Sequence, residues 1–477
     1  MKYITTPIYY INAEPHIGHA YTTIAADILA RYYRNRGKKV FFLTGTDEHG
    51  QKIQKAAKNQ KLKPKELADQ ISAIYQETWR KLDIQNDFFI RTTDLAHEKY
   101  VQDFLSRLYR KGDIYKDTYK GLYCVGCEAY ISEDDLVDGK CLLHNIEPQK
   151  IEEDVYFFRL SKYQNHLKKV IETDIFKIRP VERKNEVLSF INQGLNDVAI
   201  SRSKIKWGIK LPWDKNHTCY VWTDALLNYL SALKITKIKA WPPDVQLMAK
   251  DILRFHAVIW PAMLSAAEET LPKNIFAHGF FTVEGKKISK TLGNVVDPIV
   301  IAEKYGVGPL RYFLFREFPF GEDGDFSEKN LVKRYNSELA DDFGNLLQRA
   351  LSMVNKFKVK IIKKHREFRP NNLIEEKIES LDFQGALVEI NRCIKGANSQ
   401  IEKVKPWELV DNARKSAEIG LETDEKTKFD ELFLHLISTL HLVSYYLEPF
   451  MPREILEVQK QLKDLKPEPI FPKIRNK

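Results

Sequence analysis

Apolar positions follow two different rhythms in the two halves of this chain. In the first half, short apolar runs at residues 3–10 and 40–43 flank residues 19–36, whose apolar residues recur at helical spacing. A strand, a helix and a strand in succession predict a βαβ unit and therefore a parallel sheet. Gly37 should end the helix. Pro7 cannot donate to a sheet ladder, which predicts an edge or end position in the first strand.

The same rhythm returns further along the chain after an interruption. We expect strands at residues 219–222, 245–248 and 279–282, and helices at 224–233 and 252–267, the second one bent near Pro261. From about residue 110 to 215 the pattern loosens into short strands and turns, which predicts an insertion in the sheet domain. The fold class is therefore α/β, with a parallel sheet interrupted by an inserted domain.

After about residue 325, glycine and strand signals nearly vanish. Helical patterns occupy residues 327–358, 372–400, 406–417, 425–448 and 452–465. Amphipathic helices with short connections are typical of an all-α bundle. We thus expect the first half of the sheet domain at 1–110, the insertion at 111–215, the second half with a lysine loop at 216–325, and a helical domain at 326–477.

Composition favours a cytoplasmic enzyme. The chain has 477 residues, enough for two or three domains that each bury a core. No stretch approaches the ~18 successive apolar residues of a membrane span, and the N-terminus has neither a signal-peptide nor a transit-peptide pattern. The net charge of +10 suits a polyanionic partner. The abundance of lysine, isoleucine and asparagine in this chain explains that charge equally well.

Three of the five cysteines lie in one short segment, which favours metal binding over disulfides. The candidate ligands are Cys124, Cys127, Cys141 and His144. Two pairs with two residues between their members suit one tetrahedral zinc ion, and four protein ligands leave no open position, so the site should be structural. The alternative is a set of unrelated cysteines on a turn. Cys219 and Cys393 lack such neighbours and should be buried apolar residues.

Two histidines and a glycine, His16, Gly18 and His19, stand where the first strand gives way to the helix. Backbone N–H groups and the helix dipole at such an entrance favour a bound anion. The alternative is a pair of packing histidines. A second candidate lies in residues 287–291, where Lys287 and Lys290 alternate with hydroxyl side chains in a glycine-flanked loop. These lysines can neutralise charge as pyrophosphate leaves, or they form a solvated charge run. Together the two motifs predict adenylyl transfer from ATP.

Two further features could bind an amino acid. Asp47 follows the second strand, where a carboxylate can take up an α-amino group or cap the helix that starts near Gln51. An aromatic set at helical spacing could form a ligand pocket, although such sets are more often core. Its members are Trp222, Ala225, Tyr229, Phe255 and His256.

Six segments of the chain resemble the methionyl-tRNA synthetase family. They are residues 7–19 (PIYYINAEPHIGH), 42–50 (FLTGTDEHG), 220–225 (YVWTDA), 250–256 (KDILRFH), 278–280 (HGF) and 287–294 (KISKTLGN). The resemblance covers nearly the whole chain. It implies a class I synthetase with a Rossmann-type catalytic domain, an inserted connective domain that bears a zinc knuckle, and a helical anticodon-binding domain.

The resemblance also implies roles for individual residues. ATP would contact His16, Gly18, His19, Asp251, Lys287 and Lys290, and the histidines and lysines among these would be catalytic. Methionine would contact Ile8, Tyr10, Asp47, Trp222, Ala225, Tyr229, Phe255 and His256. Asp47 would take the ammonium group, and the aromatic edges suit a polarizable thioether. Asn345, Arg349 and Trp407 resemble the residues that read the anticodon, where an indole can stack on a base.

The chain departs from the family pattern at a few positions. Ile288 replaces the usual methionine of the lysine motif and Thr291 its final serine, and both keep the character of the side chain. Ala249 replaces the glycine before Lys250, where a methyl group would approach the adenosine ribose. Because the chain ends near the helical bundle, without the dimerising domain appended in some relatives, we expect a monomer.

The implied reaction has two steps, the formation of methionyl adenylate from methionine and Mg-ATP, and transfer of the methionyl group to the 2′-hydroxyl of the terminal adenosine of tRNA(Met). The cofactors would be one structural Zn²⁺ and the Mg²⁺ that accompanies ATP. Three alternatives stay open. They are a class I synthetase for cysteine, leucine or valine, a non-catalytic tRNA-binding relative, and a nucleotidyltransferase that activates a small metabolite. The insertion of about 100 residues is too short for the editing domain of the aliphatic-specific enzymes.

Overall fold

The structure, a computed structural model, describes residues 1–126, 129–131, 133, 136–142, 145–283, 285–287, 295–357, 370–408 and 424–475. The chain forms two compact units, Met1–His278 and Gly279–Lys477. In the described parts of the chain, we find no helix with the length and apolar character that crossing a bilayer requires.

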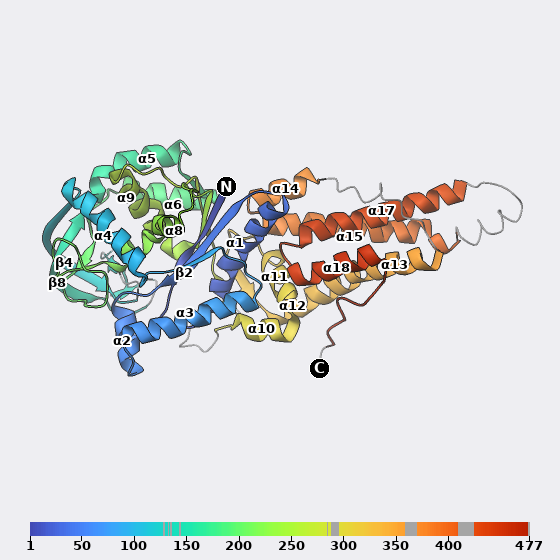
Figure 1. Ribbon diagram of the computed structural model, residues 1–477, viewed down its shortest axis with the longest axis horizontal. Helices are drawn as coiled ribbons and strands as arrows, with labels where there is room; N and C mark the ends of the chain where they lie inside the picture. The colour runs from blue at the N-terminus through green and yellow to red at the C-terminus, as the bar shows by residue number, and fades with distance from the viewer. Residues whose placement is uncertain are drawn as a thin grey trace, which may run out of the picture. The chain divides into compact units, whose positions relative to one another are not determined.

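The first unit is built on a six-stranded, fully parallel sheet (Figure 1). Its order is β3 (Phe88–Arg91), β2 (Val40–Asp47), β1 (Lys2–Tyr10), β13 (Val245–Ala249), β14 (Asn274–His278) and β9 (Lys177–Arg179). The strand order reverses between β1 and β13, which is the point where doubly wound sheets bind their ligands. The predicted parallel sheet is therefore confirmed. β1 and β2 are buried along most of their length, as expected for strands covered on both faces.

Pro7 occupies a different place from the one predicted. It lies inside a central strand, between the neighbours β2 and β13, so the expected edge or end position was wrong. The strand tolerates it because the register with β2 shifts between Thr5 and Ile8, and the pairing with β13 covers only Ile4 and Thr5. Proline is accepted at such an irregularity because no ladder bond needs its missing N–H.

Helix α1 (Ile17–Asn35) packs on the sheet against β1, β2 and β13. Gly37, with a φ of +70°, follows its end, as predicted. Other helices of this unit are α2 (Gln51–Asn59), α3 (Pro64–Lys81), α4 (Leu95–Arg110), α5 (Gln164–Glu172) and α6 (Val181–Asn192), with a 3₁₀ turn, η2, at Leu160–Tyr163.

Three predicted elements near the candidate pocket were wrong in detail. The strand at 219–222 is only β12 (Thr218–Cys219), and the helix at 224–233 is two helices, α7 (Val221–Leu226) and α8 (Asn228–Thr236). The β-branched and aromatic residues there favour a strand locally, but tertiary packing overrides that preference. The helix predicted at 252–267 is divided into a 3₁₀ turn, η3 (Lys250–Ile252), a π-helical turn, η4 (Phe255–Ile259), and α9 (Trp260–Ala266). Pro261, which cannot donate a helical hydrogen bond, lies just after the π turn.

Antiparallel structure fills much of the predicted insertion. One sheet has the order β10 (Val198–Ala199), β8 (Gln149–Phe158), β4 (Ile114–Cys124) and β5 (Ala129–Ile131). Small ladders pair β6 (Leu136–Val137) with β7 (Lys140–Cys141), and β11 (Ser201–Arg202) with β12. β9 also lies within the predicted insertion but pairs with β14 in the parallel sheet. No pattern in the sequence indicated that β9 would join the parallel sheet.

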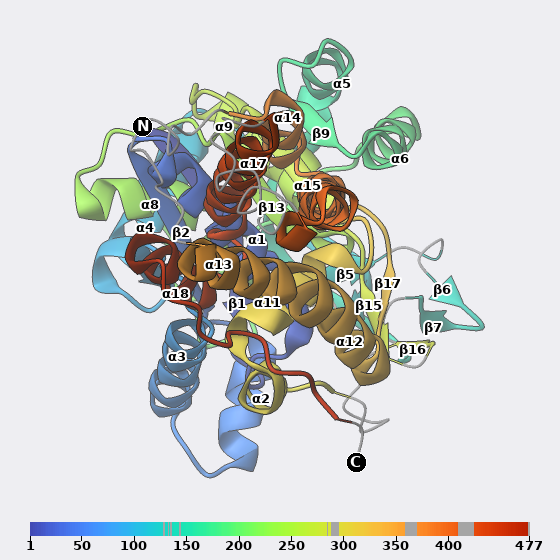
Figure 2. The same cartoon turned by 90° about the vertical axis from the view of Figure 1, so that its right-hand side faces the viewer.

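The second unit is mainly helical (Figure 2). Its helices are α10 (Pro298–Tyr305), α11 (Val307–Arg316), α12 (Glu328–Arg334), the π-helical η6 (Tyr335–Gly344), α13 (Asn345–Phe357), α14 (Asn372–Glu379), α15 (Phe383–Val404), α17 (Asp424–Leu447) and α18 (Pro452–Asp464). Figure 2 shows α13, α15 and α17 side by side, and each packs on the other two. The predicted helical region is confirmed, except that most of the helix predicted at 406–417 lies outside the described residues.

A small sheet opens the second unit. It has the order β16 (Lys286–Lys287), β15 (Phe281–Val283) and β17 (Gly324–Phe326). The strand predicted from Gly279 thus begins two residues later. A side chain at Gly279 would bring a Cβ within 2.3 Å of the Glu322 carbonyl, so the backbone can pass there only as glycine.

Candidate active site

The sequence-predicted site residues of the first unit gather after the carboxyl ends of three neighbouring strands. Tyr10 at the end of β1 is the register partner of Asp47 at the end of β2. Asp251 lies in the turn just after β13, which pairs with β1 on its other side. His16 begins the helix that follows β1. This edge of the sheet adjoins the β1–β13 reversal, so it is where a parallel α/β sheet offers a ligand site.

His16 and His19 cap the start of α1. The Gly18 N–H donates to His16 Nδ1 at 3.0 Å, and the His16 N–H donates to His19 Nδ1 at 3.1 Å. The two rings stack, with their centroids 3.8 Å apart. Because Nδ1 accepts a backbone hydrogen bond in both rings, the neutral tautomer of each carries its proton on Nε2. The capping arrangement thereby fixes two imidazole N–H donors at a helix N-terminus.

Gly18 is required by the position of the His16 ring. A Cβ at residue 18 would stand 2.9 Å from His16 Cε1 and 3.1 Å from Nδ1. Either the ring or the helix start would have to shift. The glycine therefore makes room for the imidazole that caps the helix.

His19 packs against an aromatic cluster that the sequence analysis did not predict. Tyr9 meets the His19 ring edge-on at 5.0 Å and stacks on Tyr75 at 5.7 Å. The Tyr75 hydroxyl lies 3.4 Å from His19 Nδ1, and Tyr9 Oη is 2.6 Å from Thr23 Oγ1. Burial raises the pKa of Tyr9 to about 12, so this hydroxyl stays protonated at neutral pH. The cluster keeps the His19 ring in one orientation.

Asp47 is the last residue of β2 and is 4% exposed. The helix α2 that follows is capped by Gly50, with no side-chain hydrogen bond, so Asp47 does not serve as its cap. A buried carboxylate beside a ligand site suits a cationic group, because removal from water strengthens the attraction between them.

Burial raises the pKa of the nearby Cys219 thiol, and the charges of Asp224 and Asp47 raise it further. Cys219 therefore stays a neutral, buried residue, as predicted.

The predicted aromatic set comes together from three elements. Trp222 of α7 stacks on Phe255 of η4 with their centroids 4.0 Å apart. Tyr229 of α8 places its hydroxyl 2.8 Å from His256 Nε2. Ala225, the remaining member, is 4% exposed. Because α7 and α8 are separate helices, the helical spacing that linked Trp222 to Tyr229 in the sequence is not what brings them together.

His256 is held in one protonation state by its two contacts. Its Nδ1 lies 3.0 Å from the Ile252 carbonyl, which can only accept, so Nδ1 carries the proton and Nε2 accepts from Tyr229. Burial lowers the pKa of His256 to about 4, although the Ile252 carbonyl opposes this effect. Burial also raises the pKa of the Tyr229 hydroxyl. The pair is therefore neutral and offers no charge to a ligand, which suits an apolar side chain.

The sequence missed a set of buried polar residues beside this pocket. They are His49, His97, Asp224 and Ser231, all at most 3% exposed. His49 and Asp224 stand inside two of the family segments, but nothing in the spacing of residues 49, 97 and 224 indicated that they meet.

Asp251 and Ala249 are placed at the end of β13. Asp251 is exposed, and Ala249 is half-buried as the last residue of the strand. Ile8, in β1, is partly buried against the same core as Tyr229. Ala249 and Asp251 therefore lie at the carboxyl edge of the sheet, and Ile8 lies two residues before the end of β1.

Half of the proposed zinc ligands fall within the described residues. Cys124 ends β4 and Cys141 ends β7, and both thiols are buried. Cys127 and His144 lie outside the described residues. Within the described ranges, no group of three or more histidine, cysteine or acidic side chains is arranged to hold a metal. Cys393, expected to be buried, is only half-buried.

The lysine loop is described only at its first residue. The Lys287 backbone belongs to β16 and pairs with Thr282 of β15. The Lys287 side chain and the whole of Lys290 lie outside the described residues.

The predicted anticodon residues lie at or near the surface of the helical unit. Asn345 starts α13 and is exposed, and Trp407 is 41% exposed. Arg349 Nη2 pairs with Glu402 Oε1 of α15 at 2.6 Å. The indole of Trp407 is therefore accessible from solution.

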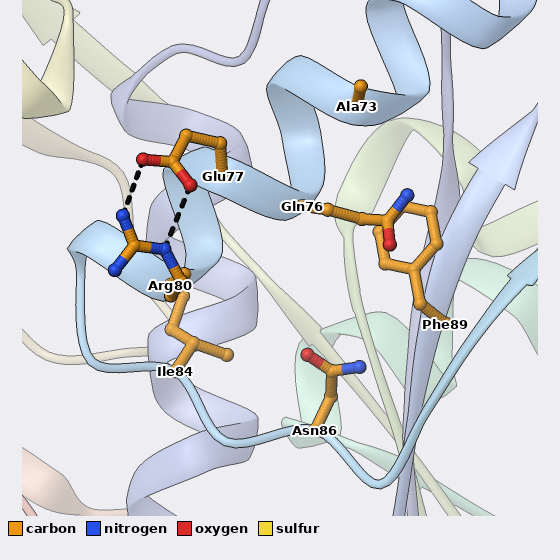
Figure 3. A pocket seen from close by; sticks show the side chains of 7 residues that line it. All are labelled: Ala73, Gln76, Glu77, Arg80, Ile84, Asn86 and Phe89. Carbon is orange, nitrogen blue, oxygen red and sulfur yellow. Dashed lines mark hydrogen bonds and ion pairs between the residues drawn. The ribbon is translucent and has the colours of Figure 1, made fainter.

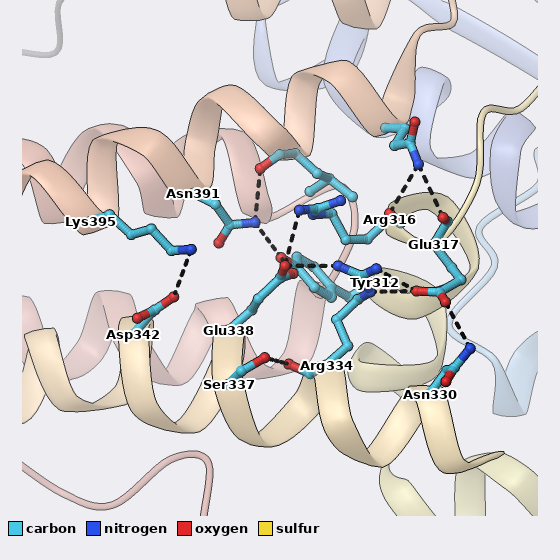
Figure 4. A network of polar contacts seen from close by, with 12 residues as sticks. Tyr312, Arg316, Glu317, Asn330, Arg334, Ser337, Glu338, Asp342, Asn391 and Lys395 are labelled. Atoms are coloured by element: carbon cyan, nitrogen blue, oxygen red, sulfur yellow. Dashed lines mark hydrogen bonds and ion pairs between the residues drawn. The ribbon is translucent and has the colours of Figure 1, made fainter. Parts of the chain in front are cut away.

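A charged network ties the helices on the N-terminal side of α13 together (Figure 4). Glu338 of η6 accepts from Tyr312 Oη at 2.7 Å and Arg334 Nη1 at 2.8 Å, and its Oε1 lies 3.0 Å from Arg316 Nη2. Asp342 pairs with Lys395 of α15 at 3.7 Å. These contacts fix the π-helical segment that leads directly into Asn345.

A hollow of about 450 Å³ on the first unit lies apart from the predicted site residues (Figure 3). It is lined by Ala73, Gln76, Glu77, Arg80, Ile84, Asn86 and Phe89. Its charged members, Glu77 and Arg80, are occupied with each other at 2.6 and 2.8 Å. The chemistry of the strand ends, rather than this hollow, marks the candidate active site.

Comparisons with known proteins agree on one family. A family model described as tRNA synthetases class I (M) matches residues 2–141 and 126–351. The methionine–tRNA ligase of Caldanaerobacter subterraneus subsp. tengcongensis is 44% identical over an alignment of 478 positions, which covers 96% of this chain and 73% of the relative. That of Rickettsia conorii is 41% identical over an alignment of 491 positions, which covers 98% of this chain and 94% of the relative. The solved structure of Mycobacterium tuberculosis methionyl-tRNA synthetase in complex with methionyl-adenylate has a TM-score of 0.86 at 36% identity and covers 100% of this chain and 99% of that chain. The chain therefore belongs to the methionine–tRNA ligase family of class I tRNA synthetases.

Proposed function

We propose that this chain joins methionine to its tRNA in an ATP-dependent reaction that passes through a methionyl adenylate. The observation that carries the proposal is the meeting of two kinds of group at one sheet edge in a member of this family. His16 and His19 present N–H donors at a helix start, and Asp47 ends the neighbouring strand β2. The hydrogen bond between His49 and Asp224 joins the loop after β2 to α7, the helix that carries Trp222. An anion binder next to a pocket for an amino acid is what adenylation requires.

In the first step the methionine carboxylate attacks the α-phosphate of Mg-ATP in line, and pyrophosphate leaves. A carboxylate is already a competent nucleophile, so positioning and charge stabilisation are the main contributions of the protein. His16 and His19 donate from Nε2 to phosphate oxygens, and Gly18 lets the triphosphate approach the backbone. Asp251 holds the ribose. Lys287 and Lys290 neutralise the departing pyrophosphate, an assignment that rests on their motif alone.

Methionine is bound by charge at one end and by apolar contact at the other. Asp47 takes the ammonium group as a buried ion pair. The thioether packs against aromatic edges, where a polarizable sulfur is favoured, and the neutral state of Tyr229 and His256 keeps that part of the pocket uncharged. The full set is Ile8, Tyr10, Asp47, Trp222, Ala225, Tyr229, Phe255 and His256.

In the second step the 2′-hydroxyl of the terminal adenosine of tRNA(Met) attacks the carbonyl carbon of the methionyl adenylate, and AMP leaves. The helical unit reads the anticodon with Asn345, Arg349 and Trp407. The exposed indole of Trp407 provides a stacking surface for an unpaired base. Arg349 reaches a base or phosphate only in competition with Glu402, its ion-pair partner in the free protein.

One structural zinc ion is held by Cys124, Cys127, Cys141 and His144 in a connective segment within 111–215. The burial of Cys124 and Cys141, each at the end of a short strand, supports the assignment. Zinc there would order a segment too small to form its own core. Metal analysis of the purified protein and of Cys141→Ser tests it, since the variant should lose the ion. The monomeric state, the cytoplasmic location and the division at residues 110, 215 and 325 stay predictions.

Exchange of labelled pyrophosphate into ATP tests the proposed reaction. Methionine should drive the exchange, whereas cysteine, leucine and valine should not. Adding tRNA(Met) should then yield methionyl-tRNA. Exchange driven by another amino acid would favour a different class I specificity, and absence of any exchange would favour a non-catalytic tRNA-binding protein.

A further inference from the structure

A buried row of polar side chains connects the segments that form the candidate methionine pocket. Asp224, 1% exposed, accepts a hydrogen bond at each carboxylate oxygen. His49 Nδ1 donates to Oδ2 at 2.7 Å, and His97 Nε2 donates to Oδ1 at 2.8 Å. Behind His97, its Nδ1 lies 2.7 Å from Ser231 Oγ. These residues come from the loop after β2, from α4, from α7 and from α8.

His49 is attached to the pocket in three ways. Its imidazole bonds to Asp224, its carbonyl accepts from the Tyr10 hydroxyl at 2.8 Å, and its ring meets Trp207 edge-on at 5.4 Å. It follows Asp47, the last residue of β2, by two residues, so the contacts that hold His49 also restrain the chain just after that carboxylate.

Asp224 is attached to the other side of the pocket. It lies in α7 between Trp222, which stacks on Phe255, and Ala225. The hydrogen bond between His49 and Asp224 therefore joins the loop after Asp47, at the ammonium-binding end of the pocket, to α7 at its aromatic end.

Electrostatics favours an ion pair at this joint. Burial lowers the pKa of His49, but the charge of Asp224 and the hydrogen bond to it outweigh burial and raise the pKa above its usual value. Burial raises the pKa of Asp224, and the two histidines more than reverse that effect. Glu98 Oε1, 3.9 Å from His49 Nε2, and the buried Glu48 also favour the imidazolium. The pair therefore adds no net charge beside Asp47.

We propose that His49 and Asp224 are positioning residues of the methionine pocket. Neither touches methionine. Their bond sets the separation between the carboxylate that takes the ammonium group and the aromatic rings that take the thioether. This deepens the proposed function and rests on it. A displacement of about 1 Å in a positioned group can cost about 100-fold in rate.

The location of the pair argues against a merely stabilising role. A buried ion pair often adds little net stability, because desolvation offsets the attraction, and packed apolar residues could replace it. A comparable buried carboxylate elsewhere in this unit, Asp113, pairs with Lys162 at 2.5 Å and touches no part of the pocket. Asp113 is therefore a matched control for the loss of a buried charge.

The first experiment compares Asp224→Asn with Asp113→Asn in the full chain, by methionine-dependent pyrophosphate exchange. The amide is isosteric but can accept from only one of the two imidazoles. We expect Asp224→Asn to raise KM for methionine about tenfold or more, while KM for ATP changes less than about twofold. Asp113→Asn should leave both constants within about twofold of the wild type, whatever it does to thermal stability.

The second experiment tests rescue by a conservative change at His49. In His49→Asn the side-chain amide nitrogen can replace Nδ1 as the donor to Asp224, whereas His49→Leu removes the donor. We expect KM for methionine to stay within about threefold in His49→Asn and to rise about tenfold or more in His49→Leu. This comparison also decides the matter if Asp224→Asn does not fold.

Three results would overturn the positioning role. They are equal increases of KM for methionine and ATP in Asp224→Asn, no change in either constant, and equal behaviour of His49→Asn and His49→Leu. A wild-type chain without methionine-dependent exchange would contradict the proposed function instead, so the two failures are distinguishable.

Discussion

The two ligand-facing regions of this synthetase are built in opposite ways. In the parallel-sheet unit the candidate methionine site is enclosed, with Asp47, Tyr229 and His256 all at most 4% exposed. In the helical unit Trp407 is 41% exposed, and Arg349 is held by Glu402, which is itself 63% exposed. A small amino acid is recognised by removal from water, whereas a nucleic acid has to reach its readers from solution. Substitutions in the first region should therefore be more costly than those in the second.

The largest effect is expected from Asp47→Asn. Loss of one partner from a buried ion pair costs about 3–5 kcal/mol, which corresponds to roughly 100-fold or more in kcat/KM for methionine. KM for ATP should change little, because the carboxylate faces the amino acid. The measurement is pyrophosphate exchange with methionine and ATP varied separately. A change of less than about fivefold in the methionine constant would remove Asp47 from the pocket.

The next effect concerns stability at acid pH and arises from His256. Its pKa in the folded protein is about 4, below the ordinary value of about 6.5, so the unfolded chain binds the proton more readily. This contribution is fully present above pH 6.5 and is lost as the pH falls towards 4, at about 3 kcal/mol in all. The free energy of unfolding in urea is measured at pH 7, 5.5 and 4.5 for the wild type and for His256→Gln. The difference in pH dependence between the two proteins isolates this group from the carboxylates.

A comparable or smaller effect is expected from Gly18→Ala. The new Cβ would stand 2.9 Å from His16 Cε1 and displace the ring or the helix start. We expect kcat for adenylation to fall about 10- to 100-fold, while methionine binding measured by Trp fluorescence changes little. Gly396→Ala is the control, since a Cβ there meets nothing within 4 Å. Normal turnover in Gly18→Ala would show that the position of the His16 ring is unimportant.

The smallest effect is expected in the exposed region. Trp407→Ala removes a stacking surface worth about 1–3 kcal/mol per base, which should raise KM for tRNA(Met) about tenfold and leave pyrophosphate exchange unchanged. Trp407→Phe keeps an aromatic face and should recover most of the loss. If exchange also fell in Trp407→Ala, the division of roles between the two units would be broken.

Much of the architecture follows from patterns of short range. Buried runs and helical spacing were enough to predict the parallel sheet and the helical region, and the family resemblance read from six segments is confirmed. Each of these predictions depends on residues that are close together in the sequence or on a continuous sequence motif.

The errors occur where long-range packing decides the conformation. Pro7 sits in a central strand because a register shift removes the need for its N–H. Val221 and Trp222 lie in a helix despite their strand-forming side chains, because α7 packs against η4, where Trp222 stacks on Phe255. The meeting of His49, His97 and Asp224 joins residues up to 175 positions apart, and no local spacing encodes it.

The division of labour between an enclosed amino-acid site and an exposed tRNA reader is tested most directly by one crossed measurement. Pyrophosphate exchange and tRNA charging are measured together in Asp47→Asn and Trp407→Ala. The account predicts that Asp47→Asn loses both activities, whereas Trp407→Ala keeps exchange and loses charging at low tRNA concentration. Full exchange in Asp47→Asn, or its loss in Trp407→Ala, would contradict the account.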